Sequence, residues 1–198
     1  MRDASVRVAI AVIAVLVAGA VALITFAIGR PEPPSFVPTP AGEVPRDATG
    51  AAVVTVDASS PDEWRFLDFE HGIIAGLATG SDWDLALRRF HIVANGGPGF
   101  PGHAGILDLG PVAFDSVTSA PAAGYIPTRL TGRDSTNAAI ERWYRYGFTS
   151  HLLTPLGHVY AVRDADGRHY VRLEILGYYC PGARPGCVTV RWAEVPAE

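Results

Sequence analysis

The stretch RHYVRLEIL at residues 168–176, together with HVYAVR at 158–163, decides the fold of this chain. Both stretches alternate apolar and polar side chains, a spacing typical of a β-strand that buries one face. The turn DADG at 164–167 separates them, and Asp-Gly in this position predicts a β-hairpin. In the second strand we expect one face to be buried and the other polar, the buried face carrying Val171, Leu173 and Ile175 and the polar face Arg172 and Glu174.

Similar short stretches, separated by turn residues, occur on both sides of this hairpin. We predict further strands at Ala52–Asp57, Trp64–Phe69, Trp83–Val93 and Cys187–Val195. Of these, Trp83–Val93 is the longest extended candidate. Within residues 50–198, only Thr136–Tyr146 has the pattern of a helix, with Ser135 or Thr136 as its N-cap. The expected fold class is therefore mainly β, with two packed sheets over residues 50–198.

The N-terminal part of the chain has a different character. Residues 8–28 carry no charge and are mostly Ala, Val, Ile and Leu. A helix of this length, at about 1.5 Å per residue, spans the roughly 30 Å hydrocarbon layer of a bilayer. The alternative is a secretory signal peptide, whose apolar region is usually about 7–15 residues long and ends at a small-residue cleavage site. Because Phe26–Arg30 is a poor cleavage context, we expect an uncleaved transmembrane α-helix.

The segments that flank this helix suggest its orientation. Two arginines within residues 1–7 favour a cytoplasmic N-terminus under the positive-inside rule. Residues 29–49 are rich in proline, and we predict an extended linker close to polyproline II. The expected location is a bacterial inner membrane, crossed once, with the domain at 50–198 in the periplasm.

The two cysteines support this location. Cys180 and Cys187 bracket the turn-forming insert PGARPG between two strand-like stretches. A hairpin there would bring their Cα atoms close enough for a disulfide, which persists only in an oxidising compartment. The alternatives are two free thiols or half of a metal site. With no other cysteine in the chain, a zinc site is disfavoured, and we predict the disulfide and no metal centre.

Composition excludes several classes of function. All 16 cationic side chains are arginine, so mechanisms that need a P-loop lysine, a Schiff-base lysine or a lysine general base are ruled out. The net charge of −4 and the absence of a basic run give no electrostatic reason to bind nucleic acid. There is no Gly-x-Ser-x-Gly motif either. We predict that the protein is not an enzyme.

Histidines are the remaining candidate ligands. None of them forms an HxH or HExxH pattern, and the six are His71, His91, His103, His151, His158 and His169. His103 lies in the glycine-rich loop at 95–110, and His151 lies near the turn at 146–155. Long ordered loops tend to carry function, which favours these two positions. Asp82 and Asp84 flank Trp83, where ion pairing with the nearby arginines or capping of a turn is the expected role.

Several motifs, taken in order, resemble the HmuY family of extracytoplasmic haem-binding proteins. In the first half they are WxFxDF at 64–69, DWDLALxR at 82–89 and NGG at 95–97. In the second half they are WYxY at 143–146, VYAVRxADG at 159–167 and the stretch 170–179. The resemblance extends over about residues 50–195.

The resemblance implies an all-β fold and haem as a possible cofactor, held between two axial side chains that are typically histidines. The candidate haem ligands are His151 and His103. The stretch 117–137, where one ligand is expected, contains no histidine, and Met1 is the only methionine.

The predicted membrane helix departs from the family, whose haem-scavenging members are commonly lipoproteins or released proteins. We therefore expect a non-catalytic accessory subunit that braces the outer face of an integral-membrane complex, for example a respiratory or photosynthetic one. The alternative function is haem binding or haem transfer of the HmuY type.

Overall fold

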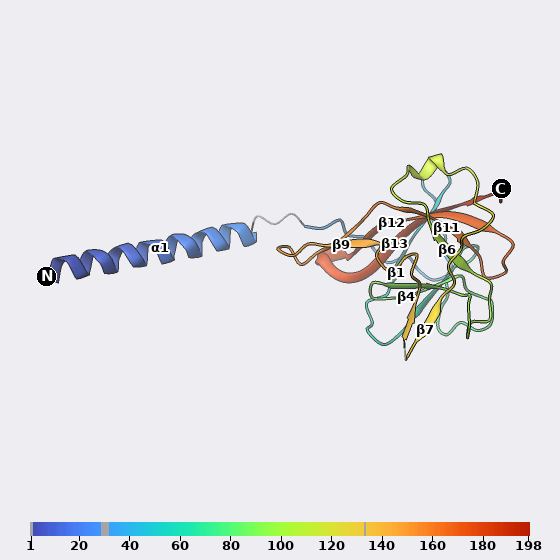
Figure 1. The fold of residues 1–198 in the computed structure, drawn as a ribbon, viewed down its shortest axis with the longest axis horizontal. Helices are drawn as coiled ribbons and strands as arrows, with labels where there is room; N and C mark the ends of the chain where they lie inside the picture. Colours follow the sequence, from blue (N-terminus) through green and yellow to red (C-terminus); the bar gives the residue numbers. More distant parts are fainter. Residues whose placement is uncertain (1, 29–31, 133) are drawn as a thin grey trace. The chain divides into compact units, whose positions relative to one another are not determined.

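The computed structural model describes residues 2–28, 32–132 and 134–198 of the chain (Figure 1). It contains two compact units, Met1–Glu32 and Pro33–Glu198. Met1 of the predicted cytoplasmic segment, and residues 29–31 at the start of the predicted linker, lie outside the described residues.

The first unit is the helix α1, Arg2–Ile28. Among the described residues, no helix has both the length and the apolar character that a membrane crossing requires. The prediction of a transmembrane helix over residues 8–28 is therefore not supported.

The larger sheet of the second unit has five antiparallel strands in the order β1-β13-β12-β11-β6 (Figure 1). Its strands are β1 (Ala52–Asp57), β13 (Arg184–Val195), β12 (Tyr170–Cys180), β11 (Val159–Arg163) and β6 (Gly105–Asp108). The turn at 164–167 joins β11 to β12, so the predicted hairpin is confirmed. Buried Thr55 and Thr189, opposite each other on β1 and β13, hydrogen-bond through their hydroxyls at 2.9 Å.

The second sheet has four antiparallel strands in the order β3-β2-β4-β5. They are β2 (Arg65–Asp68), β3 (Gly72–Ile73), β4 (Leu85–Arg88) and β5 (His91–Ala94). The prediction of one long strand over Trp83–Val93 is wrong, because the chain reverses between β4 and β5. Arg89 adopts a φ of 54° in this turn, and its backbone N–H donates to the carbonyl of Ala58 at 2.7 Å. A tertiary hydrogen bond thus stabilises a conformation that the residue types do not favour.

Two short hairpins and two 3₁₀ turns complete the second unit. The hairpins are β7 (Arg129–Thr131) with β8 (Asp134–Thr136), and β9 (Tyr144–Tyr146) with β10 (Leu153–Pro155). The 3₁₀ turns are η1 (Phe114–Ser116) and η2 (Pro181–Ala183).

The helix suggested for Thr136–Tyr146 does not form. Instead, β8 ends at Thr136, a turn follows, and β9 begins at Tyr144. Asn137 starts this turn: its Oδ1 accepts the N–H of Ala139 at 3.1 Å and its Nδ2 donates to the carbonyl of Ile126 at 2.9 Å. An asparagine that bonds nearby backbone groups favours a turn over a continuing helix.

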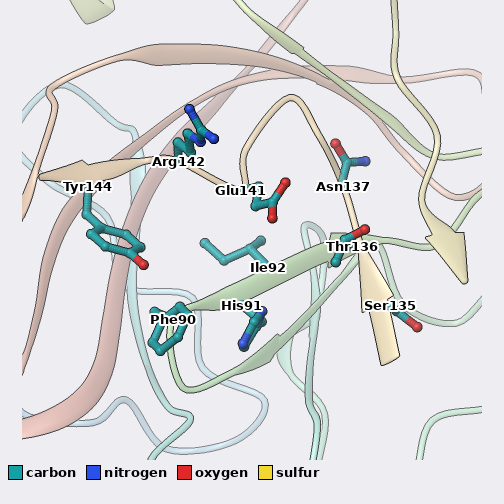
Figure 2. Close-up of a pocket in the computed structure, with 9 residues that line it drawn as sticks. All are labelled: Phe90, His91, Ile92, Ser135, Thr136, Asn137, Glu141, Arg142 and Tyr144. Carbon is teal, nitrogen blue, oxygen red and sulfur yellow. The ribbon is translucent and has the colours of Figure 1, made fainter. Parts of the chain in front are cut away.

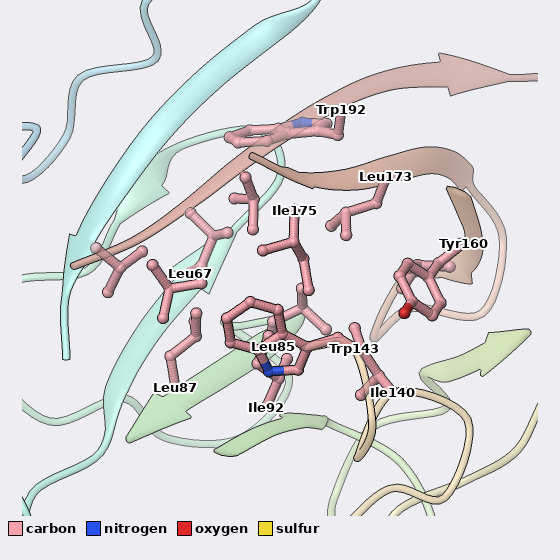
Figure 3. Packing of buried hydrophobic residues seen from close by; sticks show 14 of the residues in the cluster. Leu67, Leu85, Leu87, Ile92, Ile140, Trp143, Tyr160, Leu173, Ile175 and Trp192 are labelled. Atoms are coloured by element: carbon pink, nitrogen blue, oxygen red, sulfur yellow. The ribbon is translucent and has the colours of Figure 1, made fainter. Parts of the chain in front are cut away.

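The main core lies between the two sheets and includes side chains from both (Figure 3). The predicted buried face of β12 is confirmed, since Val171, Leu173 and Ile175 are each at most 3% exposed. Trp143 is 1% exposed and donates from Nε1 to the carbonyl of Phe90 at 2.9 Å. This indole fixes the loop before β9 against the β4–β5 turn. The expectation of a mainly β domain with two packed sheets is thus met.

Residues 33–49 of the predicted linker at 29–49 contact the domain. The N–H of Phe36 donates to the carbonyl of Tyr179 at 2.8 Å, and the N–H of Gly42 donates to that of Ile73 at 3.0 Å. Val44 packs against the main core. Prolines lack an N–H, but the residues between them keep theirs and can join a sheet edge.

The predicted disulfide joins Cys180 to Cys187, with the Cα atoms 4.9 Å apart. Both cysteines are fully buried at the end of the β12–β13 hairpin, beyond which η2 makes the turn. The disulfide therefore closes the hairpin that carries the two longest strands.

Candidate functional site

A cavity of about 200 Å³ opens between β5, β8 and the loop before β9 (Figure 2). Its lining residues are Phe90, His91, Ile92, Ser135, Thr136, Asn137, Glu141, Arg142 and Tyr144. Phe90 and Tyr144 meet edge-to-face with ring centroids 5.6 Å apart, and the rings of Phe90 and His91 are 4.4 Å apart. The cavity therefore has aromatic walls and one histidine.

The strand β9 continues from this cavity to the tip of the β9–β10 hairpin. Tyr144 and Tyr146 lie two residues apart on β9, so their side chains point to the same face of the strand. The hydroxyl of Tyr146 lies 2.6 Å from Nδ1 of His151 in the loop that connects β9 to β10. Tyr146 of the 143–146 motif and the candidate ligand His151 are thus in direct contact.

His151 is held in an unusual backbone conformation. Its φ is 57°, in the left-handed region, and its N–H donates to the carbonyl of Gly147 at 2.7 Å. The N–H of Gly147 in turn donates to the carbonyl of Leu152 at 2.8 Å. Non-glycine residues held in this region often occur at functional sites, where the surrounding contacts stabilise the strained backbone.

The tip of this hairpin is apolar and exposed to solvent. Phe148 is 87% exposed, and its ring lies 6.1 Å from the ring of Tyr146. Tyr146 is itself 48% exposed. Phe148 and Tyr146 therefore present an exposed aromatic pair beside His151.

One arginine borders the same surface. Arg142 lines the cavity, whereas Arg145 lies between the two tyrosines of β9 and so points to the opposite face of that strand. Both are exposed, and neither takes part in an ion pair among the residues described. The surface can therefore supply positive charge to an anionic ligand.

Different segments hold the two candidate ligands, His103 and His151. The backbone of His103 contacts the β11–β12 hairpin: its N–H donates to the carbonyl of Ala165 at 2.8 Å, and its carbonyl accepts Nε of Arg163 at 3.0 Å. The contacts of His151 are with the β9–β10 loop. Among the other histidines, the Nδ1 atoms of His71, His158 and His169 each lie 2.9 Å from an aspartate oxygen.

Asp84 is buried and caps turns, as one of the two roles expected for it. Its Oδ1 accepts the N–H of Ala165 at 2.7 Å and its Oδ2 accepts the N–H of Phe69 at 2.8 Å. Burial, as the largest cause, raises the pKa of this carboxyl to about 6. Neither arginine nearby is its partner, because Arg88 pairs with Asp134 and Arg89 donates to the carbonyl of Ser59. Asp82, by contrast, is exposed.

Asp84 also borders an acidic cavity of about 450 Å³, which contains no assembled metal site. The titratable residues that line it are Asp68, Glu70, His71, Asp82, Asp84, Asp164, Asp166, His169 and Glu194. In the part of the chain that the structure describes, only Asp57, Cys180 and Cys187 bring three potential ligand atoms within 4.8 Å of one another. The two cysteines of that group form the disulfide, so their sulfurs are not available as thiolate ligands.

The profile of the HmuY protein family matches residues 60–192, which include the four-stranded sheet, the β9–β10 hairpin and every strand of the larger sheet except β1 and the end of β13. This chain belongs to the HmuY family. The resemblance expected from the sequence motifs is thereby confirmed. None of the curated proteins compared with this chain matches it by sequence.

Solved structures share the fold of this HmuY-family chain at low sequence identity. A protein from Bacteroides vulgatus ATCC 8482, described as a HmuY-like haem-binding protein, has a TM-score of 0.62 and 17% identity, covering 78% of this chain and 97% of its own. The apo HmuY analogue of Tannerella forsythia has a TM-score of 0.59 and 16% identity, covering 80% and 100%. A Bacteroides fragilis NCTC 9343 protein, described as a lipoprotein, has a TM-score of 0.60 and 17% identity, covering 77% and 93%.

The sequence indicated His151 as a candidate ligand but not the residues around it. His91 is one of the six histidines and was expected on a single long strand, Trp83–Val93. The turn at Arg89, which places His91 in the wall of the cavity, was not anticipated. Tyr144 and Tyr146 were quoted only as a family motif. The signal in the sequence was the spacing of these tyrosines. They alternate along a short strand that ends two residues before Phe148, so several aromatic side chains lie close to His151 in the sequence.

Proposed function

We propose that this protein is a non-catalytic haem-binding protein of the HmuY type, with His151 as an iron ligand. The observation that carries the proposal is the 2.6 Å contact between Nδ1 of His151 and the hydroxyl of Tyr146. Metal-ligating histidines usually have one ring nitrogen fixed by a hydrogen bond, which orients the ring and leaves the other nitrogen for the metal. Nε2 of His151 is the nitrogen left for iron.

The residues around His151 suit the other properties of haem, a flat apolar ring with two carboxylates. Tyr146 and Phe148 offer exposed aromatic faces beside the histidine. Arg142 borders the same surface and suits a propionate. Bound haem would supply the iron that the histidine ligates. The protein would orient the haem, cover its apolar ring and provide charge for its carboxylates.

The cavity beside β9 is a candidate binding site for the other side of the haem. At about 200 Å³ it is smaller than the roughly 300–1,000 Å³ of pockets that enclose a whole small molecule. It can therefore take an edge of a ring that otherwise lies over the hairpin surface. His91 in its wall is the histidine best placed for a second contact, whereas His103 is held by a different hairpin.

An extracytoplasmic location fits this proposal. The buried disulfide between Cys180 and Cys187 needs an oxidising compartment. Structural relatives described as a lipoprotein and as a HmuY-like haem-binding protein point the same way. The expectation of an accessory subunit in a membrane complex stays a prediction without a supporting contact, and the family favours haem binding over it.

The proposal is tested by titrating the full-length protein and two single variants with ferric haem and following the Soret band. We expect His151→Ala to weaken binding by more than 100-fold, since it removes the iron ligand itself. His103→Ala is the matched control and should bind like the wild type, because its backbone contacts do not need the imidazole. Equal binding by the wild type and His151→Ala would overturn the assignment of the ligand.

A further inference from the structure

The β9–β10 hairpin that carries His151 rests on a tyrosine of the large sheet. The N–H of Leu153 on β10 donates to the hydroxyl oxygen of Tyr179 on β12 at 2.8 Å. Leu153 lies opposite Tyr146 in the register of β9 and β10. Tyr146, which orients His151, therefore lies directly opposite Leu153, which is hydrogen-bonded to Tyr179.

Tyr179 is in turn held by the N-terminal strap, which we define as residues 33–39. Ser35 and Tyr179 form a parallel bridge, and the N–H of Phe36 donates to the carbonyl of Tyr179 at 2.8 Å. The strap is also fixed at its other end, where the N–H of Thr39 donates to the carbonyl of Thr55 at 2.9 Å. The N–H of Thr55 returns a hydrogen bond of 3.0 Å to Oγ1 of Thr39.

A glycine makes the close approach of the strap possible. A Cβ on Gly177 would lie 2.4 Å from Cε2 of Phe36, so the phenylalanine ring occupies the space that a side chain at this position would fill. The pairing of β12 with β13 is irregular on both sides of Gly177, between Ile175 and Tyr179. The end of β12 is thus shaped to receive the strap rather than to continue as a regular strand.

From these contacts we infer that Tyr179 is a positioning residue, through which the N-terminal strap fixes the hairpin that carries His151. The inference rests on the proposed function, because the hairpin matters to haem binding only if His151 ligates the iron. The connected groups are the Phe36 N–H, the Tyr179 carbonyl and hydroxyl, the Leu153 N–H, Tyr146 and His151. Displacement of the strap would loosen the ligand side chain without touching it.

The alternative is that Tyr179 only fills the core. It is 5% exposed and meets Tyr178 edge-to-face with ring centroids 5.3 Å apart, so its ring has a packing role in any case. Removing the hydroxyl of Tyr179 distinguishes the positioning role from the packing role. Tyr179→Phe keeps the ring and removes only the acceptor of the Leu153 N–H, which leaves a half-buried donor unsatisfied.

The test uses Tyr179→Phe and Phe36→Ala in the full-length protein, with Tyr178→Phe as the matched control. Tyr178 is the neighbouring buried tyrosine at 3% exposure, and the Leu153 N–H donates to the hydroxyl of Tyr179 and not to that of Tyr178. Amide hydrogen exchange at Leu153 is measured without haem, and haem affinity is measured by Soret titration. Amides of β13, such as that of Val190, report any global loss of stability.

Tyr179→Phe should speed exchange at Leu153 and weaken haem binding, each by about five-fold, with Val190 unchanged. Phe36→Ala should shift both quantities in the same direction, which keeps the inference testable if Tyr179→Phe does not fold. Tyr178→Phe should change neither. Faster exchange with wild-type haem affinity, or weaker binding with unchanged exchange, would overturn the positioning role while the proposed function stands. A wild type that binds no haem would overturn both.

Discussion

Asp84 accepts the backbone N–H of Ala165 at 2.7 Å and so joins the two sheets of the domain. Asp84 immediately precedes β4 in the small sheet, while Ala165 lies in the turn between β11 and β12 of the large one. The second oxygen of the carboxylate accepts the N–H of Phe69, just after β2. Three segments distant in the sequence therefore meet at one carboxylate that is 5% exposed.

This carboxylate predicts a pH dependence of stability. Its pKa is raised from 3.8 to about 6, first by burial and further by the charges of Asp68 and Asp164. Between these two values the folded state binds a proton that the unfolded state has lost. The contribution of Asp84 is therefore fully present below about pH 4 and is lost as the pH rises through about 6, a change of about 3 kcal/mol.

Urea unfolding of the wild type and Asp84→Asn from pH 4 to pH 7 measures this contribution. The free energy of unfolding of the wild type minus that of the variant should fall as the pH rises, because the variant does not titrate at this position. Subtraction removes the titration of the other acidic groups. A difference that stays level or increases with pH would contradict the account.

The disulfide should contribute to stability through the unfolded chain. Cys180 and Cys187 are separated by 7 in the sequence, and closing so short a loop is worth about 2–3 kcal/mol. The double variant Cys180→Ala/Cys187→Ala should unfold at a lower temperature than the wild type in thermal denaturation followed by circular dichroism. Added reductant should lower the wild-type transition and leave the double variant unchanged; a shift in the double variant would show that the reductant acts elsewhere.

Gly96 is needed for a close approach of two backbone segments. A Cβ at this position would lie 2.0 Å from the carbonyl oxygen of Ala104, so Gly96→Ala should cost about 3 kcal/mol or prevent folding. Gly110→Ala is the matched control, because Gly110 has a φ of 78° and open space around it. Its cost should be about 1–2 kcal/mol, from the left-handed backbone alone. Urea unfolding that ranks the two variants in the opposite order would rule out the close approach as the cause.

The tyrosine beside His151 should affect haem binding more than stability. Tyr146→Phe removes the hydroxyl 2.6 Å from Nδ1 of His151 and should weaken haem affinity by about 10- to 100-fold in a Soret titration. The side chain is 48% exposed, so the free energy of unfolding should change by less than about 0.5 kcal/mol. Tyr144→Phe, on the same strand face, keeps the His151 contact and should weaken binding less. Equal effects of the two variants would argue against the orienting role.

Four strands of the large sheet could be predicted because their patterns are local, whereas β6 lies in the stretch at 95–110 that was expected to be a loop. The strand β1 was expected at its observed bounds, Ala52–Asp57, and the hairpin around Gly167 was expected from its turn residues. The disulfide followed from the turn between Cys180 and Cys187. Alternation and turn chemistry are properties of neighbouring residues, so the sequence is sufficient for them.

Features that depend on distant contacts were not predictable in this way. The turn between β4 and β5 needs Arg89 in a left-handed conformation, which is stabilised by the carbonyl of Ala58 from another segment. The turn after β8 depends on Asn137 bonding Ile126, and the strap depends on the space left at Gly177. For the same reason, the loop position of His151 could mark it as a candidate ligand from the sequence. Its contact with Tyr146 and the cavity lined by His91 could not be predicted.

The most direct measurement is an equilibrium titration of the full-length wild-type protein with ferric haem, followed at the Soret band to saturation. The proposed function predicts a shifted Soret band that saturates at about one haem per chain, with the spectrum of a histidine-ligated iron. A spectrum that remains the sum of free haem and protein throughout the titration would contradict it.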